Sequence, residues 1–180
     1  TLYTVAKDVK LQIEFNPGKT LAYRLIGYES RLLEHQDFND DKKDGGDMGA
    51  GHVVTAFYEI VPVGVESDVI GDIDDLKYQN PDVVDSDELL TVKLRYKQPD
   101  GDISEKIELP VIDNGGDNVS SDFRFASSVA MFSHLLRDSK FKGEATFEKV
   151  VSLASEGLKD DEFGYREEFI ELVQKAEGLK

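Results

Sequence analysis

The stretch from Asp37 to Asp47 is the part of the sequence richest in side chains that could bind a metal ion. Carboxylates and one amide alternate there with other residues beside a glycine pair, and the candidate ligands are Asp37, Asn39, Asp41, Asp44 and Asp47. Calcium takes about six to eight oxygen ligands, and closely spaced acidic side chains on a tight loop supply several of them. The first three candidates have the spacing of the first half of an EF-hand loop.

The second half of this loop departs from the EF-hand pattern. Lys42 stands where that loop requires glycine for its turn, and Met48 stands where it requires a bidentate glutamate. Lys42 and Lys43 also place positive charge among the carboxylates. Calcium is therefore the alternative, and the main interpretation is an acidic loop whose Asn and Asp side chains bond to nearby backbone.

The residues that most other kinds of catalytic site require are absent from this sequence. It contains no cysteine and three histidines, which excludes thiol catalysis, disulfides and thiolate zinc sites. No serine lies in a G-x-S-x-G turn, and no glycine pair belongs to a phosphate-binding loop motif. His134 lies about half a turn from the apolar stripe of its predicted helix, so we expect it to be a surface residue or to make a secondary contact. We therefore expect neither enzymatic activity nor any cofactor, calcium apart.

The elements around the acidic loop are predicted to be strands. Residues 9–15 alternate between apolar and polar side chains, the pattern of a half-buried strand. Asn16-Pro17-Gly18 turns the chain, and residues 20–28 resume the alternation, which predicts a hairpin with the first strand. Residues 53–63 predict another strand. Residues 90–97 and 103–111 predict a second hairpin around Pro99-Asp100-Gly101.

Beyond the glycine pair at 115–116 the apolar period changes from that of strands to that of helices. The first helix carries a stripe of Phe125, Val129, Phe132 and Leu136 and can be capped by Ser120, Ser121 or Asp122. Two further amphipathic helices follow Thr146 and the pair Asp160-Asp161. Short links between three such helices predict antiparallel neighbours.

The net charge of the chain restricts the kinds of molecule that we expect it to bind. The net charge is -16, from 37 acidic and 21 basic residues. Nucleic acids and anionic membranes both require clustered Lys and Arg, so we expect neither as a partner. No apolar run is long enough to span a membrane. Half of the excess charge lies between Glu66 and Glu88, which we expect to form a solvated connection between strands.

Three strings carry a resemblance over residues 5–180. They are DFNDDKKDGGDMGAGHVVTAFYEIVPVG, LLTVKLRYKQPDG and SSDFRFASSVAMFSHLLRDSKFKG. The chain resembles the C-terminal region of bacterial von Willebrand factor type A domain proteins of the YfbK type. The resemblance implies a parent protein with an N-terminal region, a type A domain and then this segment. It also implies a place in the cell envelope, periplasmic or surface-exposed.

The metal site of a type A domain cannot be transferred to this chain. That site requires a D-x-S-x-S motif, and the sequence has none; Asp85-Ser86-Asp87 and Asp138-Ser139-Lys140 come nearest. The resemblance brings no catalytic residues either. We therefore expect a non-enzymatic accessory module that contacts proteins. Its partner would be its own type A domain and N-terminal region or another protein, and the alternative is a calcium-stabilised adhesion or ligand-binding domain.

The predicted fold class is α+β. An antiparallel, β-sandwich-like part over residues 1–115 precedes a three-helix part over residues 116–180 that packs on it, the two forming one continuous unit. Each strand has one apolar face, and a second layer must cover it. The absence of an initial methionine suggests a segment of a longer protein. We expect a strand edge to remain open here and the upstream region to fill it in the parent.

Overall fold

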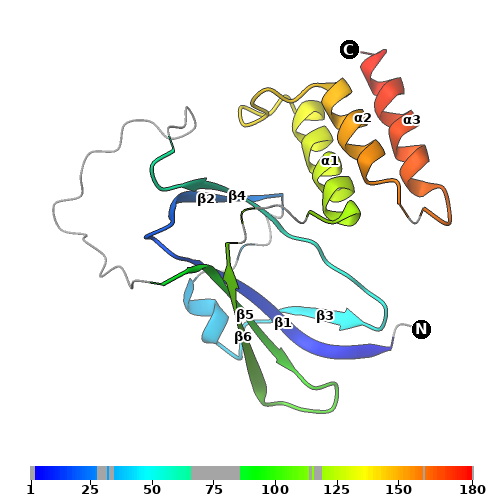
Figure 1. The fold of residues 1–180 in the computed structure, drawn as a ribbon. Coiled ribbons are helices and arrows are strands. Elements are labelled where there is room, and N and C mark those ends of the chain that lie inside the picture. Colours follow the sequence, from blue (N-terminus) through cyan, green and yellow to red (C-terminus); the bar gives the residue numbers. More distant parts are fainter. Residues whose placement is uncertain are drawn as a thin grey trace. The chain divides into compact units, whose positions relative to one another are not determined.

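The computed structural model describes residues 3–27, 32, 35–65, 86–113, 115, 119–159 and 161–179. These residues form six strands in two antiparallel sheets, followed by three α-helices, which confirms the α+β fold class (Figure 1). The chain divides into two compact units, Thr1–Asn114 and Gly115–Lys180, and each is described by itself. Most of the acidic segment predicted to be a solvated connection, residues 66–85, lies outside the described residues.

The larger sheet of the first unit has four antiparallel strands. In spatial order they are β3 (Gly46–Gly49), β1 (Thr4–Phe15), β5 (Glu88–Lys97) and β6 (Ser104–Ile112). Strands β5 and β6 form the predicted hairpin, with the turn at Pro99-Asp100. The long β1 strand lies between β3 and β5 (Figure 1). Both edges of β1 are therefore paired with a neighbouring strand.

The predicted hairpin between the first two strands is wrong. Strand β2 (Thr20–Ile26) pairs instead with β4 (Phe57–Pro62) in a separate two-stranded sheet. The turn explains the change, because Asn16 is bound to the start of β5. Its backbone N–H donates to the Leu89 carbonyl at 2.9 Å, and its side-chain amide donates to the Glu88 carbonyl at 2.7 Å. The strand expected from residue 53 begins only at Phe57.

Aromatic rings join the two sheets at one place. Phe15, at the end of β1, is 9% exposed. Its ring stacks on Tyr23 of β2, with centroids 4.2 Å apart, and meets Tyr58 of β4 at 5.5 Å. Stacked and tilted aromatic pairs of this kind add to the free energy gained from burial alone.

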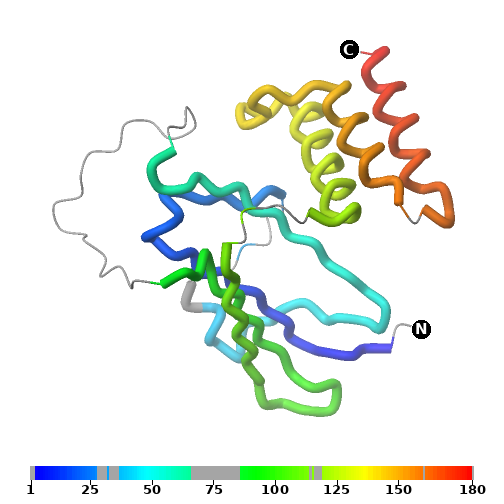
Figure 2. The backbone as a smooth tube through the Cα atoms, in the orientation of Figure 1, coloured from blue at the N-terminus to red at the C-terminus, as the bar shows by residue number. Residues whose placement is uncertain are grey.

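The second unit contains α1 (Ser121–Leu136), α2 (Phe147–Glu156) and α3 (Tyr165–Glu177), which follow one another along the tube in Figure 2. The first two helices each begin with a side-chain cap, and Ser120 is one of the three caps predicted for α1. The Ser120 hydroxyl accepts from the Phe123 N–H, and the Thr146 hydroxyl accepts from the Lys149 N–H. Each cap satisfies a backbone donor that has no partner within its helix. Among the described residues, no helix has the length and hydrophobicity that a bilayer span requires.

The helical core differs in detail from the predicted stripe. Phe132 and Leu135 of α1 are buried with Val150 of α2 and Val173 of α3, while Val129 and Leu136 are exposed. The buried side of α1 is therefore rotated toward Leu135, because α2 packs against both other helices and fixes which side of α1 is covered.

Of the two positions predicted for His134, at the surface or in a secondary contact, the surface one is wrong. His134 is buried, with 8% of its surface exposed. The chain after α1 turns back at this point, because the Ser139 N–H donates to the His134 carbonyl at 2.9 Å. Helical periodicity places a residue on a face of its helix but does not show which loop returns to cover that face.

Gly157, after α2, lies where the backbone of α1 comes very close. A methyl group there would meet the Phe125 Cβ and backbone nitrogen, each at 2.7 Å, and the Ser121 carbonyl oxygen at 2.8 Å. Real Cβ atoms are not found at such distances from backbone atoms. Only glycine lets these two helices approach this closely.

Candidate functional site

A β-bulge at Asp8 organises the polar face of the larger sheet. The pairing register of β1 shifts across this residue in both of its pairings, with β3 and with β5. Asp8 has φ +52°, in the left-handed region that Asp and Asn tolerate better than most residues. Bulges re-aim a side chain and strengthen the local twist of a strand. Here the side chain that the bulge re-aims is only 9% exposed.

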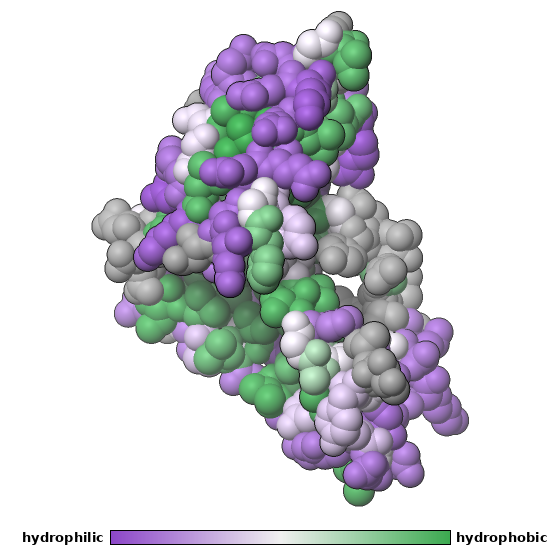
Figure 3. Space-filling view, turned by 90° about the vertical axis from the view of Figure 1, so that its right-hand side faces the viewer, coloured by the Kyte–Doolittle hydropathy of each residue, from purple (hydrophilic) through white to green (hydrophobic). Residues whose placement is uncertain are grey.

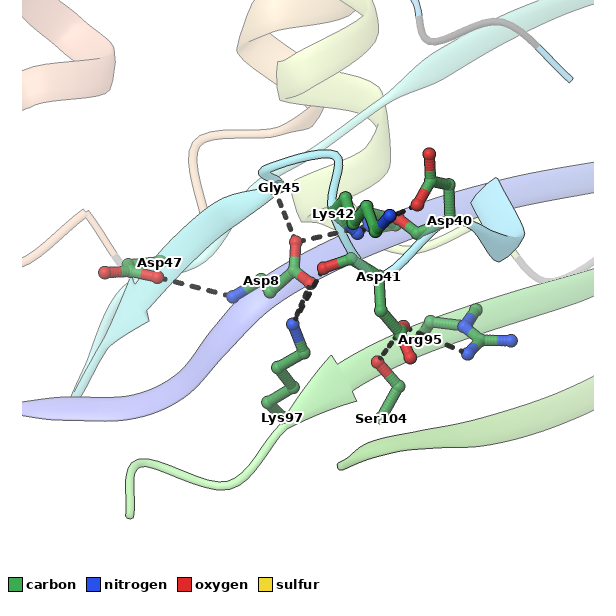
Figure 4. A network of polar contacts seen from close by, with 10 residues as sticks. Asp8, Asp40, Asp41, Lys42, Gly45, Asp47, Arg95, Lys97 and Ser104 are labelled. Atoms are coloured by element: carbon green, nitrogen blue, oxygen red, sulfur yellow. Dashed lines mark hydrogen bonds and ion pairs between the residues drawn. The ribbon is translucent and has the colours of Figure 1, made fainter. Parts of the chain in front are cut away.

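Two lysines and one backbone amide surround this carboxylate, and Figure 4 labels Lys97 and Gly45 among these partners. Oδ1 of Asp8 accepts from the Gly45 N–H at 2.6 Å and lies 3.4 Å from Lys10 Nζ, while Oδ2 lies 2.9 Å from Lys97 Nζ. Lys10 is 3% exposed and also donates to the Asp40 carbonyl at 2.7 Å. Burial alone would raise the pKa of Asp8. The hydrogen bonds from Lys97 and Gly45 and the charge of Lys10 nevertheless hold that pKa below its usual value.

The acidic loop lies on this cluster and is bonded to it. Asn39 and Asp41 both accept from the Arg95 guanidinium, at 3.2 and 3.3 Å, and the Ser104 hydroxyl donates to Asp41 at 2.6 Å. The hydrogen bond from Ser104, with the charges of Arg95 and Lys97, lowers the pKa of Asp41. The loop is thus attached to β1, β5 and β6 through side chains that point toward one another (Figure 4).

The other three predicted calcium ligands do not join Asn39 and Asp41. Asp37, in the short helix η2 (His35–Asn39), is buried and lies 3.7 Å from Lys43 Nζ. Asp47 accepts from the Asp8 N–H at 3.3 Å, and Asp44 is exposed. Within the part of the chain that the structure describes, no group of three or more His, Cys, Asp or Glu side chains is arranged to hold a metal ion. Asn39 and Asp41 are brought together, and both accept hydrogen bonds from the same arginine, Arg95.

Gly45 closes the loop onto the bulge. A Cβ atom at this position would lie 2.7 Å from the Val9 carbonyl oxygen and 2.8 Å from the Asp8 carbonyl carbon. Its neighbour Gly46 has open space around the same position. The close approach lets the Gly45 N–H reach the Asp8 carboxylate, so this glycine is required by contact and not by backbone conformation.

A hollow of about 400 Å³ lies beside the turn after β1. Several of its polar lining groups already have protein partners. Glu14 is ion-paired with Lys93, and the Asn16 amide donates to the Glu88 carbonyl. With these groups engaged, we assign no chemistry to the hollow.

The other face of the larger sheet is apolar. Residues paired directly across antiparallel strands project their side chains to the same side. The pairings of β1, β5 and β6 therefore set nine apolar side chains in three rows: Phe15–Leu90–Val111, Ile13–Val92–Leu109 and Leu11–Leu94–Ile107. We call these nine residues the apolar face. Such rows are the inner surface expected of a sheet that packs on a second layer.

Much of the apolar face is exposed. Leu11 is 49% exposed, Ile107 51% and Leu109 59%, whereas Phe15 in the first row is covered by the aromatic rings of the smaller sheet. In Figure 3, hydrophobic side chains reach the molecular surface as patches. Contiguous exposed apolar surface marks a contact site far more often than single exposed residues do.

The sequence indicated some of these features and missed others. The strand alternation located the apolar residues of the face but not its exposure. The cluster of Asp8, Lys10 and Lys97 was not predicted at all. One signal was present, since aspartate is disfavoured inside strands and Asp8 interrupts one. The partners of that aspartate come from β5 and the acidic loop, and no local pattern specifies them.

Comparison with known proteins places the chain in a family. A family model described as "Uncharacterized protein YfbK, C-terminal" matches residues 1–179. The uncharacterized protein YfbK of Escherichia coli (strain K12) is 39% identical over 186 residues. That alignment covers 99% of this chain and 31% of the relative, so the chain spans about a third of the relative's length. No solved structure matches. The chain belongs to the family of YfbK C-terminal domains.

Proposed function

We propose that this chain is a non-enzymatic protein-interaction module and that the apolar face of β1, β5 and β6 is its binding surface. The observation that carries the proposal is the exposure of Leu11, Ile107 and Leu109 in adjacent rows of one sheet. Burying one such side chain completely is worth about 1.5–3 kcal/mol. Because each is about half exposed, a partner that covered all three would gain about 3 kcal/mol from them.

The charge of the chain supports a protein as the partner. A net charge of -16 opposes binding to nucleic acids and anionic lipid surfaces, both of which attract clustered cations. Basic side chains on the polar face, Lys10, Arg95 and Lys97, already lie against the acidic loop. A flat apolar face with polar surroundings is the common anatomy of a protein–protein contact.

The non-enzymatic part of the proposal is supported by the polar clusters of the first unit. Asp8, Asp41 and Glu14 each form an ion pair with a lysine or arginine. Carboxylates held in this way are structural, and the pKa values of Asp8 and Asp41 are lowered, whereas acid–base catalysis requires a pKa near the working pH. The candidate partners are the type A domain and N-terminal region of a longer parent, or a separate protein, in the cell envelope.

Site-specific photocrosslinking in cells tests the proposal. A photoreactive amino acid would replace Leu109 on the apolar face in the full-length protein. The matched control carries it at Glu108, the neighbouring residue, whose side chain projects from the opposite face of β6. We expect crosslinks to protein, within the same polypeptide or to another, from position 109 and few from position 108. Equal crosslinking at both positions, or none at 109, would contradict the proposal.

A further inference from the structure

The two sheets of the first unit resemble an unfinished sandwich. The smaller sheet has two strands and meets the apolar face through Tyr23 and Tyr58, which contact Phe15 in the first row. The second and third rows include Leu109 and Leu11, both about half exposed. Two-stranded sheets are marginally stable on their own, and sandwiches commonly contain about seven strands or more.

The smaller sheet also carries exposed apolar residues of its own. Leu21 and Tyr23 of β2 are 53% and 57% exposed. In a two-stranded sheet each strand has one edge not used by the pairing of β2 with β4. Within the described part of the chain no further strand pairs with β2 or β4, and such an edge offers unpaired backbone N–H and C=O groups to another strand. A strand added there would extend the smaller sheet.

Resting on the proposed function, we infer that the occupant of the apolar face is a strand-forming segment from the upstream part of the same polypeptide. It adds to the β2–β4 sheet and packs on the second and third rows of the apolar face. The length of the relative supplies the first argument. The alignment covers 31% of that protein, and the matching family model is the C-terminal one, so its remaining length lies largely upstream of the matched region.

Charge supplies the second argument, because it disfavours a second copy of this chain. A symmetric dimer through the apolar face would bring together two chains that each carry a net charge of -16. Self-repulsion of this kind keeps proteins monomeric. A segment of the same polypeptide also begins at a high effective concentration, which favours it over a separate molecule.

The third argument comes from the secondary structure that already covers part of the apolar face, the β2–β4 sheet. In the first row of the apolar face, Phe15 is covered by rings that project from β2 and β4. A layer that continues the same sheet keeps the spacing of about 10 Å between stacked sheets, whereas a helix on the remaining rows would require a different separation beside it. Strands are therefore the cover that fits all three rows together.

Hydrogen exchange measured by mass spectrometry tests this inference. Amide exchange would be compared between the isolated 180-residue chain and the full-length protein that contains it. We expect exchange in β2 or β4 and in β6 to be at least about 10-fold slower in the full-length protein. The variant Leu109→Gln should return these amides toward the rates of the isolated chain. Its control, Glu108→Gln, places the same side chain on the opposite face and should leave the protection intact.

The possible outcomes separate this inference from the proposed function. Protection in the full-length protein that Leu109→Gln removes supports both. Equal exchange in the two proteins, with position 109 crosslinking to a different protein, overturns the inference and leaves the proposed function standing. If the isolated chain dimerises and Leu109→Gln abolishes the dimer, the occupant is a second copy. This result also overturns the inference and leaves the proposed function standing. Slow exchange already present in the isolated monomer, with no crosslinks from position 109, overturns both.

Discussion

Replacement of Asp8 by asparagine should destabilise the first unit strongly. The change removes the negative charge that faces Lys97 Nζ at 2.9 Å and Lys10 Nζ at 3.4 Å. Asparagine keeps an oxygen for the Gly45 N–H and tolerates φ +52°, so the variant isolates the charge from the backbone geometry. The Lys10 side chain is 1% exposed, and its ammonium would lose its carboxylate without gaining water.

The magnitude follows from the burial of the three groups. Removing one partner of a buried ion pair typically costs about 3–5 kcal/mol, because the other charge stays buried without compensation. Lys97 is 16% exposed and can partly rehydrate, which favours the lower end, about 3 kcal/mol. For a unit of this size the loss corresponds to a fall in Tm of about 10 °C. Asp8→Ala should lose about 1 kcal/mol more, because alanine is strained at positive φ.

Urea unfolding followed by circular dichroism measures this loss. The control is Asp47→Asn, an exposed residue that accepts one hydrogen bond from the Asp8 N–H, and its free energy of unfolding should change by less than about 1 kcal/mol. A double-mutant cycle of Asp8→Asn with Lys97→Met would give the coupling energy between the two groups. An Asp8→Asn variant as stable as the unmodified chain would refute the assignment of this cluster as structural.

The same carboxylate makes the stability depend on pH in a defined direction. The folded pKa of Asp8 lies below its ordinary value of 3.8. Its stabilisation is therefore fully present above that value and is lost as the pH falls through the lower, folded pKa. The stability difference between the unmodified chain and Asp8→Asn should be constant near neutral pH and shrink below about pH 4. A difference that stays constant down to pH 2 would contradict the lowered pKa.

Three further predictions concern the glycines and calcium. Gly45→Ala should lower the free energy of unfolding by at least about 2 kcal/mol, because the new methyl group meets backbone atoms, whereas Gly46→Ala should be nearly neutral in the same urea titration. Gly157→Ala should lower the Tm of the helical unit by several degrees through its clash with α1, and Gly178→Ala, whose nearest neighbour is 3.6 Å away, should not. Calcium at millimolar concentration should leave the Tm unchanged by calorimetry; a rise that disappears in Asp41→Asn would instead establish the calcium alternative.

The sequence by itself determined the elements and the fold class. Alternation located the β5–β6 hairpin because two strands that follow one another across a short turn pair residue by residue outward from that turn. Ser120 was among the predicted caps, and the helix expected after Thr146 is present, because side chains within about three residues of a helix start satisfy its backbone donors. Both features depend on short-range contacts, so the local sequence contains all the information they require.

Tertiary structure alone decided the pairing of β2, the burial of His134 and the cluster around Asp8. Strand β2 pairs with β4 because Asn16 is bound to β5, across about 70 residues of sequence. Asp8 receives its partners from β5 and from the loop before β3, and each of those segments is polar enough to lie at the surface when considered alone. Such contacts depend on which surfaces remain free after neighbouring elements have packed, and that is a property of the assembled sheet, not of any one segment.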